Sequence, residues 1–177
     1  MQGQLFRATN LKPLKFHITS SLLEPAGCCQ ESYSYNLNKI EYMDEVYEPE
    51  KSASIDLTFS NGGSGFLFIS GNVICTFKTT CSRCLGKATY DIDAEVEGYV
   101  LLRDDADLPE DVDVSECIKP EGDKNIDLSE LIYSSILLEL PLNPICSDNC
   151  TNDNISENSE LEQSNTYMPF KDLKSKL

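Results

Sequence analysis

The chain has 177 residues, the length of one ordinary domain or of one domain with tails. Its 40% hydrophobic and 25% charged residues are typical of a globular protein and exclude a fully disordered chain. With 14 Lys and Arg against 30 Asp and Glu, the net charge is −16 and the pI is near 4.3. This balance excludes a broad basic surface that would coat nucleic acid.

The sequence also predicts where the protein is found. No stretch reaches the roughly 18 uninterrupted apolar residues of a membrane helix. The first residues lack the apolar core and cleavage site of a signal peptide. We therefore expect a cytoplasmic protein without a membrane partner, whose eight cysteines do not form lasting disulfides.

The N-terminal part has weak patterns. We expect the first 30 or so residues to be irregular, because Pro13 and Pro25 interrupt any long helix. Tyr33, Tyr35 and Leu37 alternate with polar residues, which predicts a half-buried strand. The acidic segment 41–53 is interpreted as an exposed connection.

The middle of the chain has the clearest β pattern. Alternating or continuous apolar residues predict strands near 55–60, 66–69, 73–79 and 90–97, joined by turns at 61–65, 70–72 and 81–86. Four strands joined by short turns make an antiparallel meander. In the last strand, the core-facing residues are Tyr90, Ile92, Ala94 and Val96, and the water-facing residues are Asp91, Asp93, Glu95 and Glu97.

A single helix is predicted after an acidic surface loop at 104–123. Asp127 and Glu130 fit a variant capping box, and Pro141 ends the helix, which we place at 127–138. One face of this helix carries Leu128, Leu131, Ile132 and Ile136.

The predicted fold is therefore α+β: an antiparallel, partly barrelled β-meander capped by one main helix, with an irregular N-terminal segment and a disordered polar C-terminal tail. We expect one domain over 1–150, a disordered acidic and polar linker over 151–167, and a basic C-terminal segment over 168–177.

Two cysteine pairs are the strongest candidates for chemistry. Cys81 and Cys84 form a CxxC between two predicted strands, and Cys146 and Cys150 follow the predicted helix. Four thiolates bind zinc tetrahedrally at about 2.3 Å, but the wide separation of the pairs leaves buried or incidental thiols as an alternative. A redox CxxC is a further alternative, although such motifs normally open a helix.

The remaining cysteines are not expected to take part. Cys28, Cys29 and Cys117 have no matching geometry, and Cys75 lies on a predicted apolar face, where it is expected to be a small core residue.

Three segments resemble the YceD family, the large ribosomal RNA subunit accumulation protein family. They are residues 81–85, 125–132 and 138–146. The resemblance covers about residues 30–150, and residues 168–174 are similar to the family's closing Pro-x-x-x-Leu-Lys. In this family a second pair of Cys or His follows the CxxC, and Cys146 and Cys150 match it. The resemblance thus implies a structural zinc site formed by Cys81, Cys84, Cys146 and Cys150.

The resemblance also implies a function. Family members act in making or accumulating 23S ribosomal RNA, so a non-enzymatic factor of large-subunit assembly is expected. Its partner would be ribosomal RNA, a basic large-subunit ribosomal protein or an assembly factor. Many members continue with a Gly-Leu-Cys-x-x-Cys-Gly segment. Residues 151–155 replace it here, so any role of those later cysteines does not carry over.

Charged residues suggest two contact surfaces. The face formed by Asp91, Asp93, Glu95 and Glu97 is a candidate docking surface for a basic partner, with a merely solvated surface as the alternative. Candidate RNA contacts, with ordinary terminal charge as the alternative, are Arg7, Lys12, Lys15, Lys171, Lys174 and Lys176.

The competing hypothesis is a metal- or thiol-dependent enzyme, either a nuclease or a redox protein that uses the cysteine pairs. The single histidine, His17, lies in a weakly patterned segment and is expected to be structural or exposed. Four thiolates would leave zinc no open position for water. Residues 61–65 lack the helix and lysine of a phosphate loop. We therefore predict no catalytic residue and no small-molecule substrate.

Overall fold

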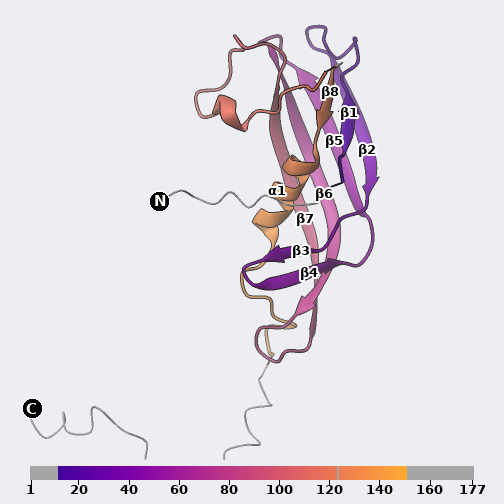
Figure 1. The fold of residues 1–177 in the computed structure, drawn as a ribbon, viewed down its shortest axis with the longest axis vertical. Coiled ribbons are helices and arrows are strands. Elements are labelled where there is room, and N and C mark those ends of the chain that lie inside the picture. The colour runs from indigo at the N-terminus through magenta and orange to yellow at the C-terminus, as the bar shows by residue number, and fades with distance from the viewer. Residues whose placement is uncertain (1–11, 123, 151–177) are drawn as a thin grey trace, which may run out of the picture.

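The computed structural model describes residues 12–122 and 124–150. Figure 1 shows an elongated, twisted antiparallel sheet with one helix against one of its faces. In chain order the elements are β1 (Lys15–His17), β2 (Cys28–Tyr35), β3 (Ile40–Tyr42), β4 (Glu45–Pro49), β5 (Ala53–Asn61), β6 (Phe66–Thr80), β7 (Lys87–Leu101), a 3-10 turn (Val114–Glu116), β8 (Asn125–Asp127) and α1 (Ser129–Glu139).

The sheet is organised around β6. On one side β6 pairs with β7 along its whole length, from Phe66 opposite Leu101 to Thr80 opposite Lys87. On the other side it pairs first with β5 and then, beyond Thr76, with β4. β2 pairs with β5, and β3 extends the sheet from β4. The prediction of an antiparallel sheet with one main helix is confirmed, and no pairing among the described residues closes the sheet into a barrel.

The core lies on one face of the sheet, called the inner face here. Alternate residues of β5, β6 and β7 point into it, and α1 and the small β1–β8 ribbon cover it. Phe16 of β1 stacks on Phe59 of β5 with ring centroids 4.0 Å apart. Ile132 and Ile136 of α1 are fully buried there. Cys75 is buried in this core, as predicted.

One predicted turn is wrong. Residues 70–72 do not reverse the chain, because β6 runs without interruption through them. Gly71 pairs with Leu57 of β5 on the inner face, where a Cβ atom would lie 2.0 Å from the carbonyl oxygen of Asp56. The glycine permits a close approach of two strands and does not form a turn.

The N-terminal half contains more strands than predicted. The expected exposed connection at 41–53 instead contains part of β3, all of β4 and the start of β5. Met43 and Asp44 both have positive φ, as a tight hairpin turn between β3 and β4 requires. The irregular N-terminal segment includes β1, which pairs with β8 more than 100 residues later, and β2 begins at Cys28. The β1–β8 pairing joins residues more than 100 positions apart and therefore leaves no signal in a short window of sequence.

The helix begins slightly later than predicted, at Ser129, because Asp127 is the last residue of β8. The carboxylate of Asp127 accepts a hydrogen bond of 3.0 Å from the backbone N–H of Ser129, so it satisfies one of the free donors of the first turn. In the described part of the chain, no helix is long and apolar enough to cross a membrane. The predicted linker at 151–167 and the basic segment at 168–177 lie outside the described residues.

Candidate metal centre

The first cysteine pair is held by the turn between β6 and β7. Backbone hydrogen bonds from Cys81 to the carbonyl of Gly86 (2.7 Å) and from Leu85 to the carbonyl of Cys81 (2.9 Å) close this turn. Leu85 has φ of +60°, which reverses the chain before β7. The backbone N–H of Arg83 points at the sulfur of Cys81, 3.4 Å away. The turn therefore places both sulfurs on one side and directs an N–H donor toward one of them.

The second pair lies on the segment 141–150, called the second arm here, which follows α1. The backbone of Ser82 in the β6–β7 turn donates to the carbonyl of Pro144 at 2.7 Å. The Tyr90 hydroxyl donates to the carbonyl of Ile145 at 2.6 Å and accepts from the N–H of Ile145. The Tyr47 hydroxyl donates to the carbonyl of Pro141 at 2.5 Å. These bonds fix the second arm against the sheet independently of the cysteines.

The structure brings the four predicted cysteines together. The sulfurs of Cys81, Cys84, Cys146 and Cys150 all lie within 4.8 Å of one another. Cys81 and Cys150 are 3.7 Å apart, and so are Cys84 and Cys146. Four sulfurs about 2.3 Å from a central zinc would be roughly 3.8 Å apart, whereas a disulfide requires about 2.05 Å. The spacing fits a tetrahedral thiolate site, and all four residues are free cysteines.

The backbone around the first pair favours thiolate formation. Hydrogen bonds from the backbone of Cys84 and Arg83 lower the pKa of the Cys81 thiol to about 6, although burial opposes this effect. The pKa of Cys150 is raised to about 12, chiefly because it hydrogen-bonds the side chain of Cys146. Adjacent thiols can share protons, but four neighbouring thiolates repel one another unless a cation lies between them. A bound divalent metal would offset this repulsion, since a coordinating thiol is deprotonated.

The ligand set is closed. Cys81 is buried, and Cys146 is exposed at the surface. Among the described residues, no His, Asp or Glu joins this cluster, and no second cluster of metal-binding side chains exists. Zinc held by four thiolates has no open coordination position, which is typical of a structural site and not of a catalytic one.

Tyr90 belongs to the site, although its position in the sequence pattern predicts only a core residue. Replacing Tyr90 by Phe is expected to destabilise the protein by about 1–3 kcal/mol, because two backbone groups of Ile145 lose their partner. Tyr133→Phe is the matched control, since the Tyr133 hydroxyl makes no hydrogen bond in the described part of the structure. Urea unfolding measures the difference, and equal losses for the two variants would contradict the role given to Tyr90.

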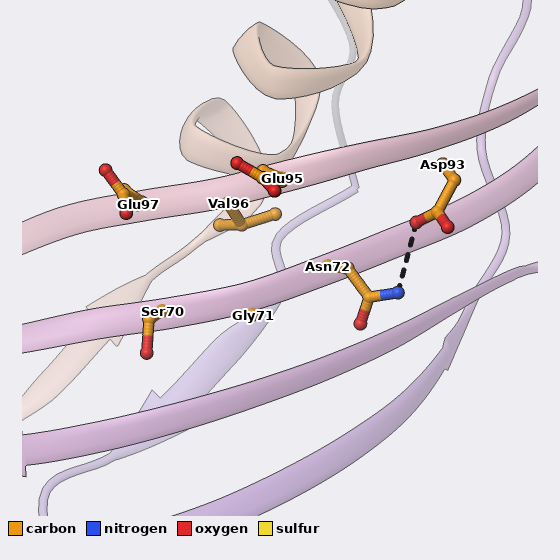
Figure 2. A pocket seen from close by; sticks show the side chains of 7 residues that line it. All are labelled: Ser70, Gly71, Asn72, Asp93, Glu95, Val96 and Glu97. Carbon is orange, nitrogen blue, oxygen red and sulfur yellow. Dashed lines mark hydrogen bonds between the residues drawn. The ribbon is translucent and has the colours of Figure 1, made fainter.

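The acidic residues predicted to face water do so. Asp91, Asp93, Glu95 and Glu97 are exposed on the sheet face opposite the core, and the intervening residues Ile92, Ala94 and Val96 are buried. Figure 2 shows Asp93, Glu95 and Glu97 around a hollow that Asn72 of β6 also lines. The alternation of the sequence had identified this face.

The candidate RNA contacts are only partly described. Lys15 forms an ion pair with Glu121 at 3.7 Å, and Lys12 lies just before β1. Arg7, Lys171, Lys174 and Lys176 lie outside the described residues. His17 is exposed and its Nδ1 lies 3.1 Å from the Asn125 side-chain oxygen, which is the surface position expected for it.

The chain was compared with protein-family models, curated proteins and solved structures. A family model described as large ribosomal RNA subunit accumulation protein YceD matches residues 69–175. The match begins within β6 and includes both cysteine pairs, whereas β1 to β5 precede it. No curated protein and no solved structure matches the chain.

Proposed function

The chain belongs to the YceD family of large ribosomal RNA subunit accumulation proteins, and from this membership we propose that it is a non-enzymatic ribosome-biogenesis factor. It would promote the synthesis, processing or accumulation of 23S ribosomal RNA during assembly of the large subunit. The family match over residues 69–175 is the observation that carries this proposal. We place the protein in the cytoplasm, where subunit assembly takes place.

Within this role we assign zinc to the four cysteines. Cys81, Cys84, Cys146 and Cys150 would hold one zinc ion, and the spacing of their sulfurs supports this assignment. The metal would supply cross-linking between the β6–β7 turn and the second arm, not catalysis, because a four-thiolate set leaves no site for water. The same absence of an open position argues against the alternative of a metal-dependent nuclease.

The alternative of a thiol redox enzyme is also disfavoured by the local geometry. A redox CxxC normally opens a helix after a strand, whereas Cys81 and Cys84 lie in a turn between two strands, where backbone hydrogen bonds lower the pKa of Cys81. Two further cysteines lie within 4.8 Å of this pair, an arrangement that suits a metal better than exchange with a substrate disulfide.

The partner is proposed to be ribosomal RNA or a basic protein of the large subunit. The acidic face of β7 disfavours RNA and suits a basic protein. Direct RNA contact would fall to the small set of basic residues at the two chain ends, Arg7, Lys12, Lys15, Lys171, Lys174 and Lys176.

Deleting the gene is the direct test of the ribosomal role. The deletion strain is expected to show a lower ratio of mature 23S to 16S ribosomal RNA and fewer free large subunits in a sucrose-gradient profile. A plasmid copy of the unaltered gene should restore both. A normal ribosome profile in the deletion strain would refute the proposed function.

A further inference from the structure

The face of the sheet that points away from α1 is called the outer face here, and no described element covers it. The helix, the β1–β8 ribbon and the β3–β4 hairpin contact the inner face or its margins. Polar and acidic side chains occupy most of the outer face, and Ile74 is 48% exposed near its middle. The positions involved are Gln30, Ser32 and Ser34 of β2, Ser54, Asp56 and Thr58 of β5, Ser70 and Asn72 of β6, and Asp93, Glu95 and Glu97 of β7.

The outer face is hollowed along β6 and β7. An open hollow of about 500 Å³ is lined by Ser70, Gly71 and Asn72 on one side and by Asp93, Glu95, Val96 and Glu97 on the other (Figure 2). Ser70 lies directly opposite Glu97, and Asn72 lies opposite Glu95. Because the β6 side chains here are short, the longer carboxylates of β7 form one wall of the hollow.

Within the described residues, no lysine or arginine pairs with the carboxylates of this wall. Asp93 accepts a hydrogen bond of 3.1 Å from the Asn72 amide, while Glu95 and Glu97 have neither hydrogen bond nor ion pair within residues 12–122 and 124–150. The nearest lysine along the outer face of β6 is Lys78, which is already paired with Glu50 at 2.7 Å. In the described part of the chain, the wall therefore presents negative charge without an ion-pair partner beside an open surface.

The spacing of the charges suits an extended chain. Asp93, Glu95 and Glu97 alternate along one strand, so they are about 6.7 Å apart, which equals the spacing of same-side residues in any extended peptide. At one end of the row, the rings of Phe68 and Tyr99 lie 5.3 Å apart and are partly exposed. Aromatic faces beside carboxylates are suited to arginine, which stacks on rings and pairs with acids.

We propose that the outer face binds an extended, arginine- and lysine-rich segment of a protein partner, with alternate cationic side chains at Asp93, Glu95 and Glu97. This inference deepens the proposed function, on which it rests, by naming the class of partner and the surface that recognises it. RNA is disfavoured because its phosphates would meet the same carboxylates. A second copy of this chain is disfavoured because each copy carries a net charge of −16.

A peptide-binding experiment tests the proposal. The probe is a fluorescent 12-residue peptide in which Arg and Ser alternate, titrated with the full chain and followed by anisotropy. The variant Asp93→Asn, Glu95→Gln, Glu97→Gln is expected to weaken binding by about tenfold, since each exposed ion pair contributes modestly. The matched control, Asp104→Asn, Glu110→Gln, Glu116→Gln, removes the same charge from the exposed loop after β7 and should weaken binding less than twofold.

Further binding measurements distinguish the proposed partner from other molecules that could bind the outer face. Equal losses for the two triple variants would overturn the proposal, because binding would then follow net charge alone. Two other ligands are tested in the same way: a single-stranded ribosomal RNA fragment and a peptide of residues 168–177. The proposal would also be overturned if either ligand bound the unaltered chain more tightly than the Arg-Ser peptide and lost that binding in the variant Asp93→Asn, Glu95→Gln, Glu97→Gln. The ribosome profile of the deletion strain is independent of these results, so failure of the docking surface and failure of the ribosomal role can be distinguished.

Discussion

Substituting Cys146 by Ser is expected to remove bound zinc and to lower the melting temperature by a large margin. Structural zinc contributes on the order of 10 kcal/mol to the folding of small zinc modules. Here it would cross-link the β6–β7 turn to the second arm, which otherwise depends on a few hydrogen bonds from Ser82, Tyr90 and Tyr47. Elemental analysis should find one zinc per unaltered chain, and calorimetry should show a fall in melting temperature with either chelator or the substitution.

The control for this prediction is Cys28→Ser. Cys28 is exposed at the start of β2 and does not belong to the cysteine cluster, so its substitution should leave zinc content and melting temperature unchanged. Cys81→Ser should resemble Cys146→Ser, because the two residues belong to one cluster. Protein purified without chelator that contains no zinc, and that melts at the same temperature as Cys146→Ser, would contradict the metal site.

Replacing Gly71 by Ala is expected to destabilise the protein by about 3 kcal/mol or more, the upper range for overpacking a well-packed interior. The new methyl group would lie 2.0 Å from the carbonyl oxygen of Asp56 and 3.0 Å from the Cα of Leu57, and both are backbone atoms that cannot rotate away. The β5–β6 pairing would have to separate, and this pairing connects β2 to the rest of the sheet. Urea unfolding at equilibrium measures the loss.

Gly62→Ala provides the comparison for Gly71→Ala. Gly62 lies in the β5–β6 hairpin turn, and a Cβ atom there would meet nothing within 4 Å. Its substitution should change stability by no more than about 0.5 kcal/mol, as is usual at open surface positions. If the two alanine variants unfolded at the same urea concentration, the close strand approach at Gly71 would not matter for stability.

Residues 70–72 show why a turn-like sequence pattern can give a wrong prediction. Ser70, Gly71 and Asn72 have turn-forming composition, yet they lie in the middle of a 15-residue strand. A turn and a close approach of two strands can have the same composition, because both can require glycine, which has no side chain. Only the presence of β5 at that point, with the Asp56 carbonyl against Gly71, distinguishes them.

The prediction of an exposed connection at the acidic segment 41–53 is wrong for a different reason. Because Glu and Asp dominate this segment, its composition predicts an exposed connection. Ile40 beside it and Tyr47 within it are nevertheless buried and lie opposite each other in the β3–β4 hairpin. Tyr47 is also the residue whose hydroxyl holds Pro141 of the second arm. A single buried aromatic residue among acids is too weak a signal to predict a strand without knowledge of its partner.

The sequence by itself determined the local features: the alternation that forms β5 and β7, the apolar face of α1 and the two cysteine pairs. Each of these features depends on residues that are close together in the sequence, because side-chain direction repeats with a fixed short period in strands and helices. Only the tertiary structure decided that β1 pairs with β8, that β6 is continuous, and that the Tyr90 hydroxyl holds the second arm so that all four sulfurs lie within 4.8 Å. These features join residues distant along the chain, and their formation depends on the packing of the whole core, which no short stretch of sequence encodes.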